Sequence, residues 1–101
     1  MNTNNDISRV VEQLNIKFNP KKLILFGSHA KGNAGSNSDI DLCVITDTAD
    51  KRKLLTDMYS TIDCERPFDL LLYTPKEWEE NVMDKLSFAH VINKQGVVLH
   101  G

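Results

Sequence analysis

Apolar residues recur along the chain with helical spacing in several segments, and these segments predict the helices. Positions 7, 10, 11 and 14 are apolar and follow Asn5 or Asp6 as candidate N-cap, which predicts a first helix over 6–15 that Pro20 prevents from continuing. The same spacing predicts a helix over 50–62. A third helix begins at 74–77, where threonine, proline and glutamate occupy the N-cap, N1 and N3 positions. Helical spacing then resumes at residue 88 and runs to Gly96, a candidate C′ residue.

Short runs of apolar and β-branched residues predict the strands. Residues 22–26, 39–45 and 68–73 each form such a run, and 97–99 could add a short last strand. Residues 28–38 contain glycine, serine and asparagine and almost no apolar side chain, so this segment is predicted to be a loop. The alternation of elements predicts an α/β (α+β) fold in which helices flank a small mixed β-sheet.

Length and composition narrow the class of protein. A chain of 101 residues with 41% hydrophobic and 26% charged residues is expected to fold as one domain over 1–101. No apolar stretch approaches the ~20 residues that span a bilayer, so no membrane association is expected, and the polar start predicts a cytoplasmic protein. Cys43 and Cys64 belong to no Cys/His cluster, which argues against a zinc site. A net charge of −2 argues against nucleic-acid binding by the chain alone.

Two aspartates in one predicted strand are the first candidate for chemistry. Asp39 and Asp41 should point to the same face because side chains alternate along a strand. Their mutual repulsion favours a hard cation such as Mg²⁺, which prefers oxygen ligands. Asp69 is a further acid inside a predicted apolar strand. If that strand neighbours the second strand, three carboxylates converge on one metal site.

The glycine-containing loop that precedes the acids has the character of an anion site. Gly27 and Ser28 end an apolar strand and Gly32 follows, so backbone N–H groups can approach a phosphate where a Cβ would obstruct them. Ser28 adds a hydroxyl donor, and a short helical turn starting near it would aim its first amides at phosphate oxygens. A phosphate cradle followed by an acid cluster is what nucleotidyl transfer requires, with two metal ions stabilising the attacking and leaving oxygens.

The motif that joins these residues resembles that of a known superfamily. Gly27-Ser28, ten further residues and then Asp39-Ile40-Asp41 resemble the GSX10DXD signature of the DNA polymerase β-like superfamily, specifically its minimal nucleotidyltransferases. The chain looks most like the antitoxin of HEPN/MNT toxin–antitoxin pairs. The signature covers residues 27–41, and the order of elements as far as Asp69 extends the likeness over most of the chain.

The resemblance implies specific roles for these residues. Asp39 and Asp41 correspond to shared Mg²⁺ ligands, for two ions as a rule, and Asp69 to the third ligand and the base toward an acceptor hydroxyl. The implied substrate is ATP. Lys31 stands where the family often has arginine, so it retains the positive charge toward phosphate without the bidentate geometry of a guanidinium group.

The likeness also implies a partner. After the strands and helices are assigned, too little chain remains to form a pocket for a small acceptor, and the antitoxins it resembles adenylylate their toxin. We therefore expect transfer of AMP to a hydroxyl, most simply a tyrosine, of a HEPN-type toxin, within a hetero-oligomer or with this chain as a homodimer. Two alternatives are a non-catalytic antitoxin that neutralises its partner by occlusion, and a small-molecule nucleotidyltransferase, although enzymes of the latter kind usually carry a further acceptor-binding domain.

Other residues that could carry chemistry have simpler interpretations. His29, His90 and His100 receive no role, since none has a recognisable partner in the sequence. Trp78 and Phe88 could stack on a base, but their helical spacing favours core packing. An EF-hand is excluded because apolar residues interrupt the acids and no glycine occupies the required turn.

Overall fold

Four strands form one mixed sheet in the computed structural model, which describes residues 3–32, 34–35 and 38–101. The strands are β1 (Lys22–Phe26), β2 (Ile40–Ile45), β3 (Phe68–Tyr73) and β4 (Val97–His100), and their order in the sheet is β3-β2-β1-β4. The pair β2 and β3 is parallel, and β1 is antiparallel to both β2 and β4. The mixed sheet flanked by helices confirms the predicted fold class, and the fourth strand is part of the same sheet.

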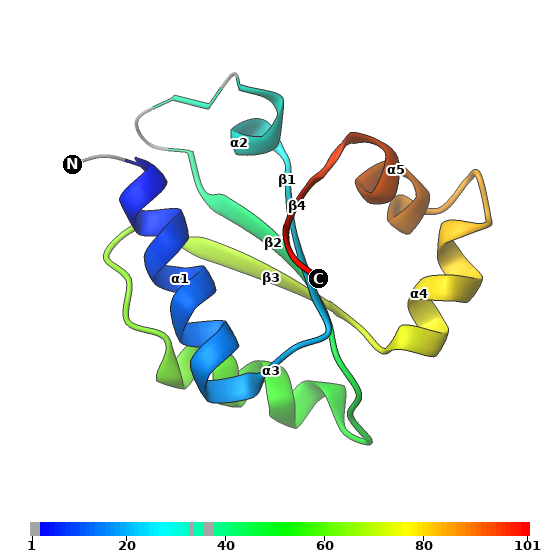
Figure 1. Ribbon diagram of the computed structural model, residues 1–101, viewed down its shortest axis with the longest axis horizontal. Coiled ribbons are helices and arrows are strands. Elements are labelled where there is room, and N and C mark those ends of the chain that lie inside the picture. Colours follow the sequence, from blue (N-terminus) through cyan, green and yellow to red (C-terminus); the bar gives the residue numbers. More distant parts are fainter. Residues whose placement is uncertain (1–2, 33, 36–37) are drawn as a thin grey trace.

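Helices cover both faces of this sheet. They are α1 (Thr3–Phe18), α2 (Ser28–Lys31), α3 (Lys51–Thr61), α4 (Pro75–Val82) and α5 (Phe88–Gln95). Figure 1 shows α1 and α3 on one side of the sheet and α4 and α5 on the other, with α2 at the end of β1. Within the described part of the chain, no helix is long and apolar enough to cross a membrane.

The alternation of side chains along the strands divides the core into two clusters. The α1/α3 face is mainly aliphatic and comprises Val10, Leu14, Leu23, Leu25, Ile40, Leu42, Val44, Met58, Ile62, Leu70 and Leu72. The α4/α5 face comprises Ile24, Cys43, Ile45, Trp78, Ala89 and Ile92, with Phe26, Leu71, Tyr73 and Val82 packed against them. Asp41 and Asp69 occupy strand positions in phase with this second set, so the acids belong to the α4/α5 face.

The first helix is longer than the sequence pattern predicts. It begins at Thr3, so the proposed N-cap at Asn5 or Asp6 is wrong and both residues lie inside the helix. Asp6 is instead buried, and its Oδ2 accepts a hydrogen bond from Arg66 Nε at 3.0 Å. The helix ends at Phe18. Asn19 follows with a left-handed φ of 47°, and its N–H donates to the carbonyl oxygens of Leu14 and Asn15 before Pro20.

The N-termini of two later helices are capped by their own sequence. Asp50 caps α3, because its side chain accepts from the N–H of Lys53 at 3.1 Å. Thr74 and Glu77 form the predicted capping box at α4: the Thr74 hydroxyl accepts from the Glu77 N–H at 3.2 Å, and the Glu77 carboxylate accepts from the Thr74 N–H at 3.0 Å. These local signals explain why both helices start where the sequence predicts.

Two features of the loops differ in detail from the prediction. The predicted loop over 28–38 begins with the four-residue helix α2, and residues 33, 36 and 37 of that loop lie outside the described residues. Gly96 follows α5 but is not in the left-handed conformation of a typical C′ glycine, since its φ is −75°. It is required by close packing instead, because a Cβ there would lie 2.5 Å from both Ile24 Cγ2 and the Ile92 carbonyl oxygen.

Candidate active site

Gly27 joins β1 to α2 in a conformation that only glycine adopts readily. Its φ is 74° and its ψ is −155°, and Gly32, which follows the end of α2, is left-handed with a φ of 75°. The first amides of a helix have no partner within it, and Gly27 has no side chain to cap them. The backbone geometry at Gly27 is therefore consistent with the predicted phosphate-binding turn that contains Ser28.

The same glycine lies directly against one of the acids. Phe26, the last residue of β1, is the partner of Asp41 in the β1/β2 pairing. The next residue, Gly27, therefore follows the end of this strand beside the Asp41 side chain. A Cβ added at Gly27 would overlap Asp41 Oδ2. The backbone conformation thus requires glycine, and its close approach to this carboxylate physically connects the two halves of the motif.

The three predicted acids lie at neighbouring positions of the sheet. Asp41 is directly opposite Asp69 in the parallel register of β2 and β3, and Asp39 immediately precedes the start of β2. Asp41 is partly buried, whereas Asp39 and Asp69 are exposed. The pKa of Asp41 is raised above its ordinary value, first by burial and then by the charges of Asp69 and Asp39, while His29 acts in the opposite direction.

The acids suit a hard cation by their chemistry, although they do not form a compact metal site. Among the described residues, no three His, Cys, Asp or Glu side chains are close enough together to hold a metal ion as they stand. Asp39, Asp41 and Asp69 nevertheless offer carboxylate oxygens, the type of ligand that Mg²⁺ prefers. The pKa of Asp41 is raised first by burial and then by the charges of Asp69 and Asp39, and a bound cation would compensate both costs of the negative charge, so these residues fit a divalent metal.

Two hydrogen bonds hold the backbone just before Asp39, and no pattern in the sequence predicts them. The carbonyl oxygen of Ser38 accepts hydrogen bonds from His29 Nε2 at 3.0 Å and from Arg66 Nη1 at 3.2 Å. Arg66 also forms the ion pair with Asp6, and the two side chains are only 15% and 8% exposed. His29 thus contacts the backbone beside Asp39, a contact that the sequence could not indicate because its partner is a backbone carbonyl nine residues away.

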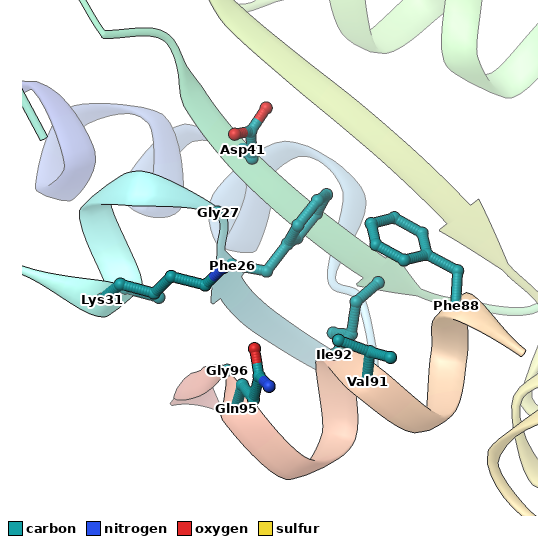
Figure 2. A pocket seen from close by; sticks show the side chains of 10 residues that line it. Phe26, Gly27, Lys31, Asp41, Phe88, Val91, Ile92, Gln95 and Gly96 are labelled. Carbon is teal, nitrogen blue, oxygen red and sulfur yellow. The ribbon is translucent and has the colours of Figure 1, made fainter. Parts of the chain in front are cut away.

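A pocket of about 250 Å³ opens beside Gly27 and Asp41. Its lining residues come from the end of β1, α2, β2 and α5: Phe26, Gly27, Ala30, Lys31, Asp41, Phe88, Val91, Ile92, Gln95 and Gly96. Figure 2 shows Lys31 extending from α2 toward the middle of the pocket and Gln95 entering from α5 on the opposite side. Lys31 and Gly27 therefore share one cavity with Asp41. Gly32, which follows α2, is exposed and is not among the residues that line the pocket.

One of the two aromatic residues assigned to the core lies elsewhere. Trp78 is buried and makes an edge contact with Tyr73, with ring centroids 5.4 Å apart, which confirms core packing. Phe88 is 55% exposed and lines the pocket, so its assignment to the core is wrong. Helical periodicity indicated that Phe88 and Ile92 share one face of α5, but not that Ile92 is buried while Phe88 remains exposed.

The comparisons with known proteins agree with this geometry. The family model described as "Polymerase beta, Nucleotidyltransferase" matches residues 6–100. The fold is similar to the crystal structure of a proposed nucleotidyltransferase from Sulfolobus solfataricus, with a TM-score of 0.56 and 19% sequence identity over 93% of this chain and 76% of that one. A search of curated proteins finds no significant match. Since the family match covers nearly the whole chain, this protein belongs to the polymerase β nucleotidyltransferase family.

Proposed function

We propose that this protein is an Mg²⁺-dependent adenylyltransferase that transfers AMP from ATP to a hydroxyl group of a HEPN-type toxin and thereby acts as its antitoxin. The observation that carries the proposal is the contact between the two halves of the motif: the Gly27 backbone lies against the Asp41 carboxylate, and Asp69 is next to Asp41 in register. A triphosphate held at the turn would thus have its α-phosphorus beside the acids.

Each residue of the motif has a role in this reaction. Asp39, Asp41 and Asp69 are the proposed metal ligands, and Mg²⁺ when bound supplies charge neutralisation for the phosphates and the leaving group. The amides after Gly27, the Ser28 hydroxyl and the Lys31 ammonium group are the proposed contacts to phosphate oxygens. The lysine contributes a point charge rather than a bidentate fork.

The proposed transfer is an in-line displacement at the α-phosphorus. The acceptor oxygen forms a bond to that phosphorus, the bond from phosphorus to the bridging oxygen of the β-phosphate breaks, and pyrophosphate leaves. The proton of the acceptor hydroxyl passes to Asp69. This carboxylate is exposed, so it can be reached by an incoming group from outside the domain.

The exposure of the acids is the reason to propose a protein acceptor. Asp39 and Asp69 are open to solvent, and the neighbouring pocket of about 250 Å³ is below the ~300–1,000 Å³ of pockets that enclose a whole small ligand. A docked protein would deliver its own hydroxyl and exclude water from the reaction. The resemblance to minimal nucleotidyltransferase antitoxins favours a HEPN-type toxin, with a tyrosine as the simplest acceptor.

The test is modification of the toxin itself. We would incubate the protein, MgATP and the HEPN-type toxin from an adjacent reading frame, and measure the toxin's mass. An added AMP group with the wild-type protein, absent with Asp69→Asn, is the expected result. An unmodified toxin that is neutralised equally well by wild type and Asp69→Asn would refute transfer and support the alternative, neutralisation by occlusion.

A further inference from the structure

The pocket beside the motif has two chemically different walls. One wall contains Gly27, Lys31 and Asp41, which are all part of the proposed triphosphate and metal site. The opposite wall comes from α5, where positions 88, 91, 92 and 95 follow one another at helical spacing and line the same cavity. A ligand that reaches the first wall with its phosphates therefore has its remaining part beside α5.

The α5 wall exposes apolar side chains that the fold itself does not bury. Phe88 and Val91 are 55% and 40% exposed, while Ile92 between them and the sheet is buried. Phe88 is oriented by an edge contact with Phe26, whose ring centroid is 5.5 Å away at an interplanar angle of 86°. The ring is thus oriented by its contact with Phe26 and still lines the pocket, and Figure 2 shows the two rings side by side.

A single polar side chain completes this wall. Gln95 lies one further turn along α5, is exposed, and carries both an amide donor and a carbonyl acceptor. An apolar surface with one group able to both donate and accept suits a flat heterocycle, which offers faces for contact and an edge for hydrogen bonds. The small volume of the pocket also fits one part of a nucleotide better than the whole molecule.

We propose that the α5 wall is the nucleobase subsite: Phe88 and Val91 contact the face of the base, and Gln95 reads its hydrogen-bonding edge, while the triphosphate passes Lys31 toward Asp41. This inference rests on the proposed function, because it assigns the remaining part of the same nucleotide. The proposed subsite lies outside the signature at residues 27–41. In this proposal Gln95 determines which nucleoside triphosphate the protein prefers.

A protein partner is the competing occupant of this wall, and the shape of the surface argues against it. Met83 and Leu86, between α4 and α5, are more exposed than Phe88 and form no part of the pocket lining. Phe88 and Val91 instead face a concavity that they share with Lys31 and Asp41. Continuity with the phosphate side is what a bound nucleotide requires, whereas a protein would be expected to use the protruding residues as well.

The first experiment separates the base from the phosphates. Calorimetric titration would compare MgATP with magnesium tripolyphosphate, which lacks a base, for wild type, Phe88→Ala and Phe88→Leu. We expect Phe88→Ala to weaken ATP binding about 10-fold or more and to leave tripolyphosphate binding unchanged, with Phe88→Leu intermediate. Leu86→Ala is the matched control, because Leu86 is 96% exposed outside the pocket, and it should change neither affinity.

The second experiment tests the reading of the base edge. Gln95→Leu keeps a side chain of similar size without hydrogen-bonding groups, and we expect it to reduce the discrimination among ATP, GTP, CTP and UTP several-fold while tripolyphosphate binding is retained. Unchanged melting temperatures in all variants would show that the fold is intact. An unaltered order and spread of the four affinities in Gln95→Leu would overturn the role assigned to this residue.

Other outcomes distinguish failure of the subsite from failure of the proposed function. Wild-type protein that binds ATP and tripolyphosphate equally, or a Phe88→Ala variant with wild-type ATP affinity, would overturn the subsite and leave nucleotidyl transfer standing. Unchanged nucleotide binding combined with weakened toxin association in Phe88→Ala would reassign the wall to the protein partner. Wild-type protein that binds neither ligand would overturn the proposed function and the subsite with it.

Discussion

The two faces of the sheet are built from the same strands but have different properties. The α1/α3 face is an aliphatic cluster in which Leu23, Ile40, Leu42 and Val44 are completely buried. The α4/α5 face contains aromatic rings, a partly buried aspartate and a pocket that leaves Phe88 exposed. A single strand such as β2 thus supplies the core on one side and the proposed site on the other.

The difference indicates where stability and function reside. Close packing of aliphatic side chains stabilises the fold and tolerates little change in volume. Charges placed close together, as at Asp41, work against stability and are retained where a ligand compensates them. Asp41 and Leu42 are consecutive residues on opposite faces, so substitutions at these two positions compare the faces directly.

The largest effect is expected from Asp41→Asn on transfer. Loss of the central carboxylate should reduce the rate of AMP transfer by roughly 100-fold or more, the scale on which removing one electrostatic group at a reacting centre acts. Without metal, the melting temperature should rise slightly, because the neutral amide removes the cost of burying the charge and then the repulsion from Asp69 and Asp39. A rate assay and thermal unfolding measure the two effects.

The pH dependence of that stabilisation follows from the raised pKa of Asp41. Below the ordinary aspartate pKa of about 3.9, the carboxyl is neutral in both the folded and unfolded states, so Asp41→Asn should gain nothing. As the pH rises toward the higher folded-state pKa, the folded protein holds the proton longer than the unfolded chain, and wild type loses stability relative to the variant. Full transfer activity in Asp41→Asn would remove this residue from the site.

The next effect in size is expected from Leu42→Ala on stability. Leu42 is fully buried in the aliphatic cluster, and its truncation should lower the free energy of unfolding by about 2–5 kcal/mol. Urea unfolding gives the change, and nucleotide affinity measured on the folded fraction should remain near that of wild type. A loss of transfer rate as large as that expected for Asp41→Asn, in protein that is still folded, would contradict the separation of the two faces.

A smaller effect is expected at the capping box of α4. Thr74→Ala removes the hydroxyl that accepts from the Glu77 N–H and should cost about 1 kcal/mol of unfolding free energy. Glu77→Gln keeps an acceptor for the Thr74 N–H but removes the charge. Because the pKa of Glu77 is lowered, chiefly by the backbone hydrogen bond from Thr74 and then by Lys51, its charge stabilises the fold above the ordinary glutamate pKa.

That contribution of Glu77 should be lost as the pH falls through the lowered pKa. The difference in stability between wild type and Glu77→Gln should therefore shrink toward zero in acid, while the cost of Thr74→Ala should persist there. Denaturant titrations of both variants at several pH values provide the measurement. A Glu77→Gln difference that grows on acidification would show that the carboxylate does not stabilise the helix start.

Local sequence signals predicted most of the fold and part of the site. The strands that became β1, β2 and β3 and the capping box at Thr74 are encoded by neighbouring residues, so periodicity and helix-start signals were sufficient. The pairing of Asp41 with Asp69 was predicted only conditionally, because the order of strands in a sheet depends on contacts between distant segments. The structure met that condition by placing β3 beside β2.

The features that the sequence missed all depend on such distant contacts. Asp6 looked like an N-cap and instead pairs with Arg66, sixty residues away. His29 had no visible partner because a backbone carbonyl leaves no trace in the sequence. Phe88 has the spacing of a core residue but is the first residue of α5 and is 55% exposed, which depends on how the start of that helix is placed against the sheet. No local pattern carries this information.

The parallel register that aligns Asp41 with Asp69 has a consequence for how the sheet assembles. If β3 paired with β2 one residue out of step, its side chains would exchange faces, and Asp69 would be driven among the aliphatic residues beneath β2. An ionised carboxylate in that environment is far more costly than a misplaced leucine. The proposed metal ligand therefore also selects against the wrong strand pairing while the chain folds.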